Sequence, residues 1–195
     1  MNSIVFGIAF IAGLALVVLS LVSVLAPRIR FWPPPGVDTW QYRVFWTLFR
    51  ILVIGIVLLS VLDYHGDGEV GGLRVFIGVF LVLAGFGAAF YATFYLGWRN
   101  AHGEARGLKT DGWYRWSRNP VYVVSIVGMI GIALLVNSSL VTCLLILWAL
   151  TYLVAPFLEE PWLENEYGQA FLDYKEKVPR FIEVPRRKMG QAAAA

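Results

Sequence analysis

The sequence predicts an all-α membrane protein, a bundle of five membrane-spanning helices that forms a single domain over residues 1–195. The first observation is composition: 58% of the residues are hydrophobic and 15% are charged, whereas a soluble domain is about half apolar and about a quarter charged. The second is the presence of several apolar runs near the roughly 20 residues that a spanning helix needs. The third is that Lys and Arg gather in alternate connections between these runs.

The first span is predicted at residues 4–26, an uninterrupted apolar run that Pro27 ends. No basic residue precedes this run, whereas a signal peptide has a charged start and a shorter apolar core. We therefore expect a retained helix. The connection that follows contains Pro33-Pro34-Pro35-Gly36, which is stiff and non-helical. Trp32 beside it suits the membrane interface.

The second and third spans are predicted at residues 45–62 and 73–96. Arg50 lies near the start of the second span, where it either snorkels toward the lipid head groups or points into a site. His65 lies in the connection between them, but one His among acidic residues gives no recognised metal-ligand spacing, so we predict no metal site. The glycines of the third span that allow close helix packing are Gly78, Gly85 and Gly87.

The fourth and fifth spans are predicted at residues 121–136 and 140–157, separated only by Asn137-Ser138-Ser139. So short a connection predicts a tight helical hairpin. The fourth span begins at a natural helix start, because Asn119 can cap the free N–H groups and Pro120 fits the first turn. That structural role is a sufficient alternative explanation for both residues.

Beyond the fifth span, apolar residues from Leu163 to Val178 recur at helical spacing, with charged residues between them. This pattern predicts one amphipathic helix that lies on the membrane or on the protein's own polar loops, and Pro179 ends it. Together with the polar linker at residues 97–122, the segment at residues 158–185 is expected to form the functional site.

Topology follows from the positions of the basic residues. The connection after the first span, the linker after the third and the C-terminal tail are rich in Lys and Arg, and the other connections are not. The positive-inside rule then places the N-terminus outside, and the linker and the C-terminus in the cytoplasm. Arg118-Asn119-Pro120 and Glu159-Glu160 are therefore expected at the same side of the membrane, at opposite feet of the hairpin.

The adjacent acids Glu159 and Glu160 are the strongest chemical signal in the chain. They repel each other, and they are expected at the C-terminal end of an apolar helix, where the helix dipole disfavours negative charge. A cationic partner would relieve both costs; the alternative is that both face water. Neighbouring helical residues point about 100° apart, so we expect at most one to face a site directly.

Two residues of the linker complete the candidate site. Arg118 can bind an anion or a lipid phosphate, or it is one more positive charge on the cytoplasmic side. Tyr122 can stack on a planar group, or it is an interface aromatic. A ligand with a cation, a planar base and a polar tail suits this set, and S-adenosylmethionine is such a ligand. These residues alone establish only a polar site that faces the cytosol.

Several short polar and aromatic motifs follow one another along the chain. In order they are Leu108 to Tyr114 with Gly112, Arg118-Asn119-Pro120-Val121-Tyr122, Glu159-Glu160-Pro161, Leu163, Tyr167-Gly168, Phe171, Tyr174 and Val178-Pro179-Arg180. This order resembles the integral-membrane methyltransferases related to isoprenylcysteine carboxyl methyltransferase and phosphatidylethanolamine N-methyltransferase, over residues 97–185. The isoprenylcysteine enzymes usually have His where this chain has Asn119. Asn-Pro-x-Tyr with a later Glu-Glu-Pro looks closer to the phospholipid enzymes.

The resemblance implies a methyltransferase that uses S-adenosylmethionine and acts on a lipid-like or small hydrophobic acceptor, which reaches the methyl group laterally from the bilayer. It implies no nucleic-acid partner. The cofactor-binding residues that it implies are Gly107, Leu108, Gly112, Tyr114, Arg118, Asn119, Pro120, Tyr122, Glu159 and Glu160. The catalytic residues that it implies are Glu160, Arg180 and Arg118.

For an amine acceptor, Glu159 or Glu160 is the candidate general base. The competing hypothesis is a non-catalytic protein, a small membrane carrier or an accessory subunit. A carrier favours charged groups within its spans, and apart from Arg50 no charged residue lies mid-span.

Overall fold

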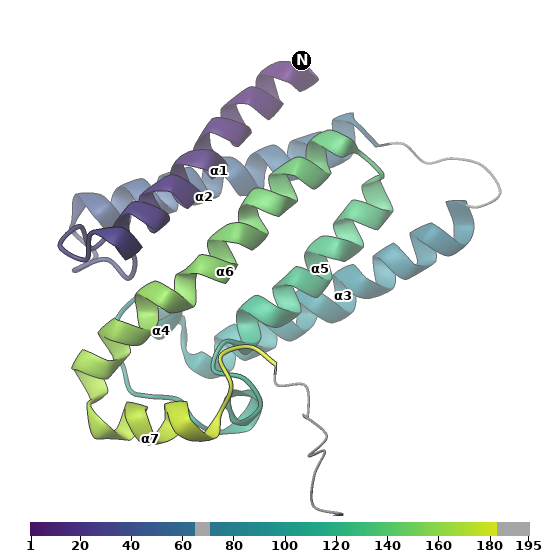
Figure 1. Cartoon of the computed structure of the whole chain (residues 1–195). Helices are drawn as coiled ribbons and strands as arrows, with labels where there is room; N and C mark the ends of the chain where they lie inside the picture. The colour runs from purple at the N-terminus through teal and green to yellow at the C-terminus, as the bar shows by residue number, and fades with distance from the viewer. Residues whose placement is uncertain (65–70, 183–195) are drawn as a thin grey trace, which may run out of the picture.

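The computed structural model describes residues 1–64 and 71–182, and this part of the chain is built from helices (Figure 1). The long helices are α1 (Asn2–Leu25), α2 (Trp40–Leu62), α3 (Gly71–Leu96), α5 (Pro120–Val136) and α6 (Ser139–Tyr167). The short ones are α4 (Trp98–Ala101), the 3-10 helix η1 (Gly112–Arg115) and α7 (Gln169–Lys177).

Four of these helices, α1, α2, α3 and α6, are long and apolar enough to cross a membrane. The chain is therefore an integral membrane protein. α5 has 17 residues, which is about the shortest length that spans a hydrocarbon core. Four of the five expected spans thus meet the requirement by length and composition, and α5 stands at its lower limit.

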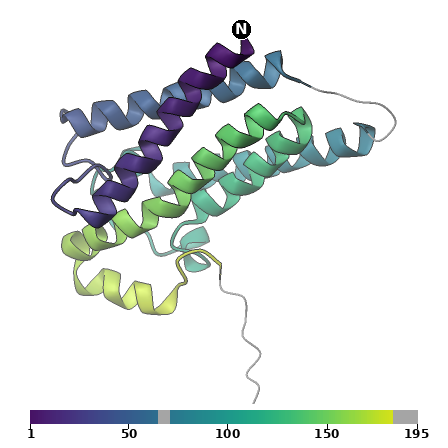
Figure 2. The same cartoon turned by 45° about the horizontal axis from the view of Figure 1, so that its top comes forward.

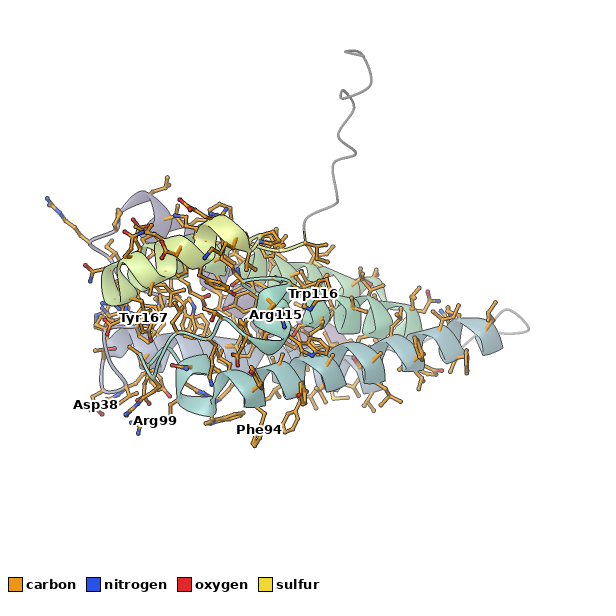
Figure 3. The ribbon with its side chains drawn as sticks, turned by 90° about the horizontal axis from the view of Figure 1, so that it is seen from below. Asp38, Phe94, Arg99, Arg115, Trp116 and Tyr167 are labelled. Atoms are coloured by element: carbon orange, nitrogen blue, oxygen red, sulfur yellow. The ribbon has the colours of Figure 1, made fainter. Side chains whose placement is uncertain are left out.

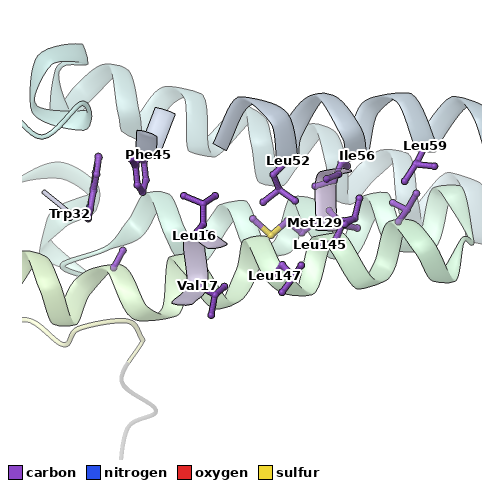
Figure 4. Packing of buried hydrophobic residues seen from close by; sticks show 14 of the residues in the cluster. Leu16, Val17, Trp32, Phe45, Leu52, Ile56, Leu59, Met129, Leu145 and Leu147 are labelled. Atoms are coloured by element: carbon purple, nitrogen blue, oxygen red, sulfur yellow. The ribbon is translucent and has the colours of Figure 1, made fainter. Parts of the chain in front are cut away.

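The long helices pack in one bundle (Figures 1 and 2). α1 packs on α2 and α6, whereas α3 packs on α5, and α5 lies between α3 and α6. The main hydrophobic core lies where α1, α2 and α6 meet, and the buried Leu16, Leu52 and Leu147 come from these three helices (Figure 4). Burying large aliphatic side chains in this way supplies the main drive for the helices to associate within the protein.

Glycine makes the contact between α3 and α5 very close. A Cβ atom on Gly131 would lie 2.6 Å from the backbone nitrogen of Val82, and one on Gly78 would lie 2.9 Å from that of Leu135. A Cβ on Gly85 would collide with the backbone of Gly128. The expected packing role is therefore confirmed for Gly78 and Gly85. It is wrong for Gly87, which has open space around it.

The connection between α5 and α6 consists of Asn137, in the left-handed conformation, and Ser138, whose hydroxyl accepts a hydrogen bond from the N–H of Val141. The connection is as short as expected, but α5 packs most extensively on α3. At this end of the bundle, Asp63 accepts hydrogen bonds from Asn2 Nδ2, at 3.0 Å, and from the Ser138 hydroxyl. These contacts join α1, the end of α2 and the start of α6.

Two expectations about the region beyond residue 157 are wrong. α6 does not end near Glu159 and Glu160 but continues to Tyr167, with Pro156 and Pro161 inside it. The argument that these acids face an unfavourable helix dipole therefore fails. The expected single amphipathic helix is broken at Gly168, which has a φ of +53° and lies between the end of α6 and the start of α7. Glycine adopts a positive φ readily and often ends helices. His65, and the residues after 182, lie outside the described residues.

Candidate functional site

Three parts of the chain lie together at one end of the bundle: the polar linker, helix α7 and the loop that follows α1 (Figure 3). A small hydrophobic cluster joins the linker to α7: Tyr114 of η1 packs with Phe171 and Tyr174 of α7 and with Val178 beyond it. The Tyr174 hydroxyl donates a 2.6 Å hydrogen bond to the backbone oxygen of Tyr114. The amphipathic C-terminal segment therefore covers the protein's own linker, one of its two expected positions.

Glu160 is the centre of an ion-pair network at this end. It is 5% exposed, and its Oε1 accepts from Arg118 Nη2 at 2.8 Å and from Arg180 Nε at 2.7 Å. Its Oε2 accepts from Arg180 Nη2 at 2.7 Å. Both carboxylate oxygens are thus occupied by guanidinium groups, and Glu160 holds the pKa of Arg180 above its ordinary value through this hydrogen bonding.

Arg118 also holds the end of α7. Its Nη1 donates to the backbone oxygens of Lys175, at 2.7 Å, and Val178, at 3.0 Å. Its backbone N–H donates to the oxygen of Pro179 at 2.9 Å. The expected meeting of the linker and the Glu pair is therefore present as an Arg118–Glu160 ion pair, and the same guanidinium fixes the C-terminal segment against both.

Asn119 occupies the N-cap position of α5, and Pro120 is the first residue of the helix, as the sequence predicts. The Asn119 side chain makes no capping hydrogen bond. Instead its Nδ2 donates to the backbone oxygen of Arg180 at 2.9 Å, so the capping role expected for Asn119 is wrong. Asn119 is a second point at which the linker binds the C-terminal segment.

Glu159 has a different environment from its neighbour. One of its oxygens, Oε1, accepts a 2.6 Å hydrogen bond from Trp32 Nε1 and a second from the Tyr122 hydroxyl. No Lys or Arg forms an ion pair with Glu159 in the described part of the chain. Because adjacent helical residues diverge by about 100°, Glu160 joins the ion-pair network and Glu159 does not, although both line one cavity.

This cavity has a volume of about 620 Å³ and lies between the helices and the linker. Such a volume is typical of a site for a small organic ligand. Glu159 and Tyr122 line one part of it, and Tyr152 of α6 packs on Tyr122 with ring centroids 4.7 Å apart. The part of the wall around Glu159 thus carries aromatic rings, a combination that favours a cationic ligand with a planar group.

The linker forms another wall, folded around the side chain of Asn100. Asn100 Nδ2 donates to the backbone oxygens of Leu96, at 3.0 Å, and Gly107, at 3.3 Å, while its Oδ1 accepts from the N–H of Arg106 at 2.7 Å. The N–H of Gly107 donates to the Tyr167 hydroxyl at 3.1 Å. These bonds place backbone groups of the linker against the cavity.

Most residues expected at the site line the cavity, namely Gly107, Leu108, Tyr114, Arg118, Asn119, Tyr122, Glu159 and Glu160. Three do not. Gly112 has a φ of +57° and lies against the Tyr95 ring, Pro120 starts α5, and Arg180 lies on the outer side of Glu160 with its guanidinium 4.1 Å from the Phe157 ring centroid. The roles expected for these three residues stay predictions.

Sequence reasoning missed the aromatic residues that the first half of the chain brings to the cavity. Trp32 and Trp46 line it, although the sequence indicated only a place at the membrane interface for Trp32. His102 also lines it and stacks on Trp46, with ring centroids 4.5 Å apart. Its Nδ1 lies 2.7 Å from the backbone oxygen of Trp98, to which it donates, because a carbonyl oxygen can only accept. No local motif marks these residues.

The buried tyrosines predict a response to alkaline pH. Burial raises the pKa of the Tyr114 and Tyr174 hydroxyls above the ordinary value. In the unfolded chain they ionise near pH 10, so the stability they contribute is complete below about pH 10 and is lost as the pH rises further. An alkaline titration followed by tyrosinate absorbance should show tyrosines that ionise well above pH 10. The Tyr174→Phe variant should show one such tyrosine fewer than the wild type. Simultaneous ionisation of all tyrosines near pH 10 would contradict this.

Comparisons with known proteins concern the second half of the chain most strongly. The family model described as phospholipid methyltransferase matches residues 69–170. Two curated relatives are phosphatidylethanolamine N-methyltransferases of Saccharomyces cerevisiae strains YJM789 and RM11-1a, each 24% identical over 147 residues. Each alignment covers 68% of this chain but 16% of the relative's length. No solved structure matches the chain.

Proposed function

The chain belongs to the phospholipid methyltransferase family, and from this premise we propose that it transfers a methyl group from S-adenosylmethionine to a lipid-like acceptor held in the membrane. The observation that carries the proposal is that Glu159 lines a cavity of about 620 Å³ together with the aromatic rings of Trp32, Tyr122 and Tyr152. A carboxylate among aromatic rings suits a ligand that carries a positive charge and a planar base.

When bound, S-adenosylmethionine supplies an electrophilic methyl group on a positively charged sulfur. Glu159 stabilises positive charge in the cavity, and its orientation is fixed by the hydrogen bonds from Trp32 and Tyr122. Linker groups at Gly107 and Leu108, which line the cavity, would hold the polar parts of the cofactor. Holding donor and acceptor in line in this way supplies most of the rate enhancement available to a methyl transfer.

An amine acceptor must also lose a proton before it can attack. Of the two acids proposed for this role, Glu160 already accepts three hydrogen bonds from arginine side chains. Glu159 is therefore the better candidate for the base. Glu160, Arg118 and Arg180 become positioning residues, which hold the linker, α6 and the C-terminal segment together around the cavity.

The cavity extends from the linker to residues of α2 and α3. This extension supports entry of the acceptor from the bilayer, between those helices, toward a cofactor held at the cytoplasmic end. The cytoplasmic position of the linker and α7 belongs to the same proposal, and it rests on the basic residues of the linker and the tail.

Binding of S-adenosylhomocysteine to the detergent-purified protein tests the proposal by calorimetry. We expect saturable binding of one molecule per chain, and no binding of adenosine alone at the same concentration. A sample that retains its helical circular dichroism but binds neither S-adenosylhomocysteine nor S-adenosylmethionine would overturn the proposal. That result would instead favour the non-catalytic alternative, a carrier or an accessory subunit.

A further inference from the structure

We propose that Arg50 binds the phosphate of an acceptor phospholipid and so positions the head-group amine of that lipid for methyl transfer. This inference rests on the proposed function and adds to it a residue that recognises the acceptor lipid. Arg50 lies on α2, is exposed and lines the cavity. Of the two readings that the sequence leaves open for this residue, the proposal takes the one in which it serves a site.

The first argument is the uncompensated charge of Arg50. No carboxylate forms an ion pair with it within residues 1–64 and 71–182. It lies seven residues, or roughly 10 Å, further along α2 than Arg43, and an apolar stretch from Ile51 to Leu59 follows it. A charge at such a position within a spanning helix is costly and is typically retained for a function.

The second argument is that the other cations of the cavity are engaged or lie elsewhere. Arg118 is buried and bound to Glu160 and to two backbone oxygens. Lys109 belongs to the linker, where its ammonium lies 5.4 Å from the centroid of the Tyr95 ring. Arg50 is the cavity cation that belongs to a membrane-spanning helix, and it is therefore the one a lipid meets on entry.

The third argument is the order of residues along α2. Trp46, Arg50 and Ile54 are spaced four residues apart, so they share one helix face, and all three line the cavity. Each step of four residues covers about 6 Å. From the bilayer toward the linker, a lipid would therefore meet the apolar side chain of Ile54, then the guanidinium of Arg50, and then the Trp46 ring, which stacks on His102.

A phospholipid with an ethanolamine head group has the same order of chemistry: acyl chains, phosphate, amine. The guanidinium of Arg matches a phosphate with two parallel hydrogen bonds, and aromatic rings attract an ammonium group. With its phosphate at Arg50, the lipid places its amine beside Trp46 and toward the part of the cavity that contains Glu159. Thr93 and Leu96 of α3 also line the cavity.

The test measures methyl transfer in dodecyl maltoside micelles with two acceptors, phosphatidylethanolamine and octadecylamine, which has an amine but no phosphate. We expect Arg50→Gln to raise the KM for phosphatidylethanolamine roughly ten- to hundredfold, the effect of one lost hydrogen-bonded charge. The KM for octadecylamine should stay unchanged, and Arg50→Lys should recover part of the loss. Arg43→Gln, an exposed Arg outside the cavity on the same helix, is the matched control and should behave as wild type.

Binding of S-adenosylhomocysteine to the same variants separates the possible failures. Weaker binding to Arg50→Gln would mean that Arg50 contacts the cofactor carboxylate, and this would overturn the proposal. An equal change for both acceptors, or none for either, would also overturn it, because Arg50 would then serve the fold or the surrounding head groups. If the wild-type protein binds no S-adenosylhomocysteine, the proposed function fails first.

Discussion

Replacing Glu159 with Gln is expected to weaken S-adenosylmethionine binding and methyl transfer strongly while the protein stays folded. Gln keeps an oxygen that can accept the hydrogen bonds from Trp32 and Tyr122, but it removes the negative charge from the cavity. Loss of a hydrogen-bonded charged partner costs about 1.5–3 kcal/mol, so we expect Kd to rise about ten- to hundredfold. Isothermal calorimetry with S-adenosylmethionine measures this effect.

Glu166→Gln is the matched control for this prediction. Glu166 lies seven residues further along α6, is exposed and does not line the cavity. The substitution removes the same charge from the same helix, so a general effect of net charge would appear in both variants. Equal affinity of wild type, Glu159→Gln and Glu166→Gln would show that the Glu159 carboxylate does not contact the cofactor.

Replacing Glu160 with Ala is expected to destabilise the protein rather than only its ligand site. The Arg118 side chain is 9% exposed, and it loses its carboxylate partner in this variant. Breaking a buried ion pair by removing one partner typically costs about 3–5 kcal/mol, because a charge remains buried without compensation. Chemical denaturation in detergent micelles should report this loss.

An exposed ion pair between α6 and α7 gives the comparison. Glu164 forms a 3.4 Å ion pair with Lys175, and both side chains are well exposed. Exposed pairs contribute about 0–1 kcal/mol, so Glu164→Ala should change the free energy of unfolding by no more than that. If Glu160→Ala and Glu164→Ala have equal stabilities, the network of Glu160 with the two arginines does not hold this end of the protein.

The sequence predicts the bundle well because apolar runs and alternating basic connections are strong, local signals. The same alternation places Arg118 and Glu160 at one end of the bundle, and the structure joins them at 2.8 Å. Gly78 and Gly85 also predict close helix packing from the sequence, but the structure is needed to identify α5 as the partner of α3.

The sequence does not predict which of the two acids joins the ion-pair network and which bonds with the aromatic side chains. This difference depends on α6 continuing as a helix through Pro156 and Pro161, where a local rule places a helix end. Membrane helices tolerate proline because surrounding groups satisfy the freed carbonyls. The role of Trp32 in the cavity was missed for a related reason. Trp32 donates a hydrogen bond to Glu159, which lies 127 positions further along the chain, and no sequence pattern links such distant residues.

The most direct test of the central claim is methyl transfer from S-adenosylmethionine to phosphatidylethanolamine by the purified protein in mixed micelles, with the products identified by mass spectrometry. We predict a methylated phosphatidylethanolamine whose formation depends on both components and is greatly reduced in Glu159→Gln but not in Glu166→Gln. Absence of any methylated lipid from wild-type protein that binds S-adenosylhomocysteine would contradict the assignment of a phospholipid acceptor. Equal product from wild type and Glu159→Gln would contradict the assignment of the cavity.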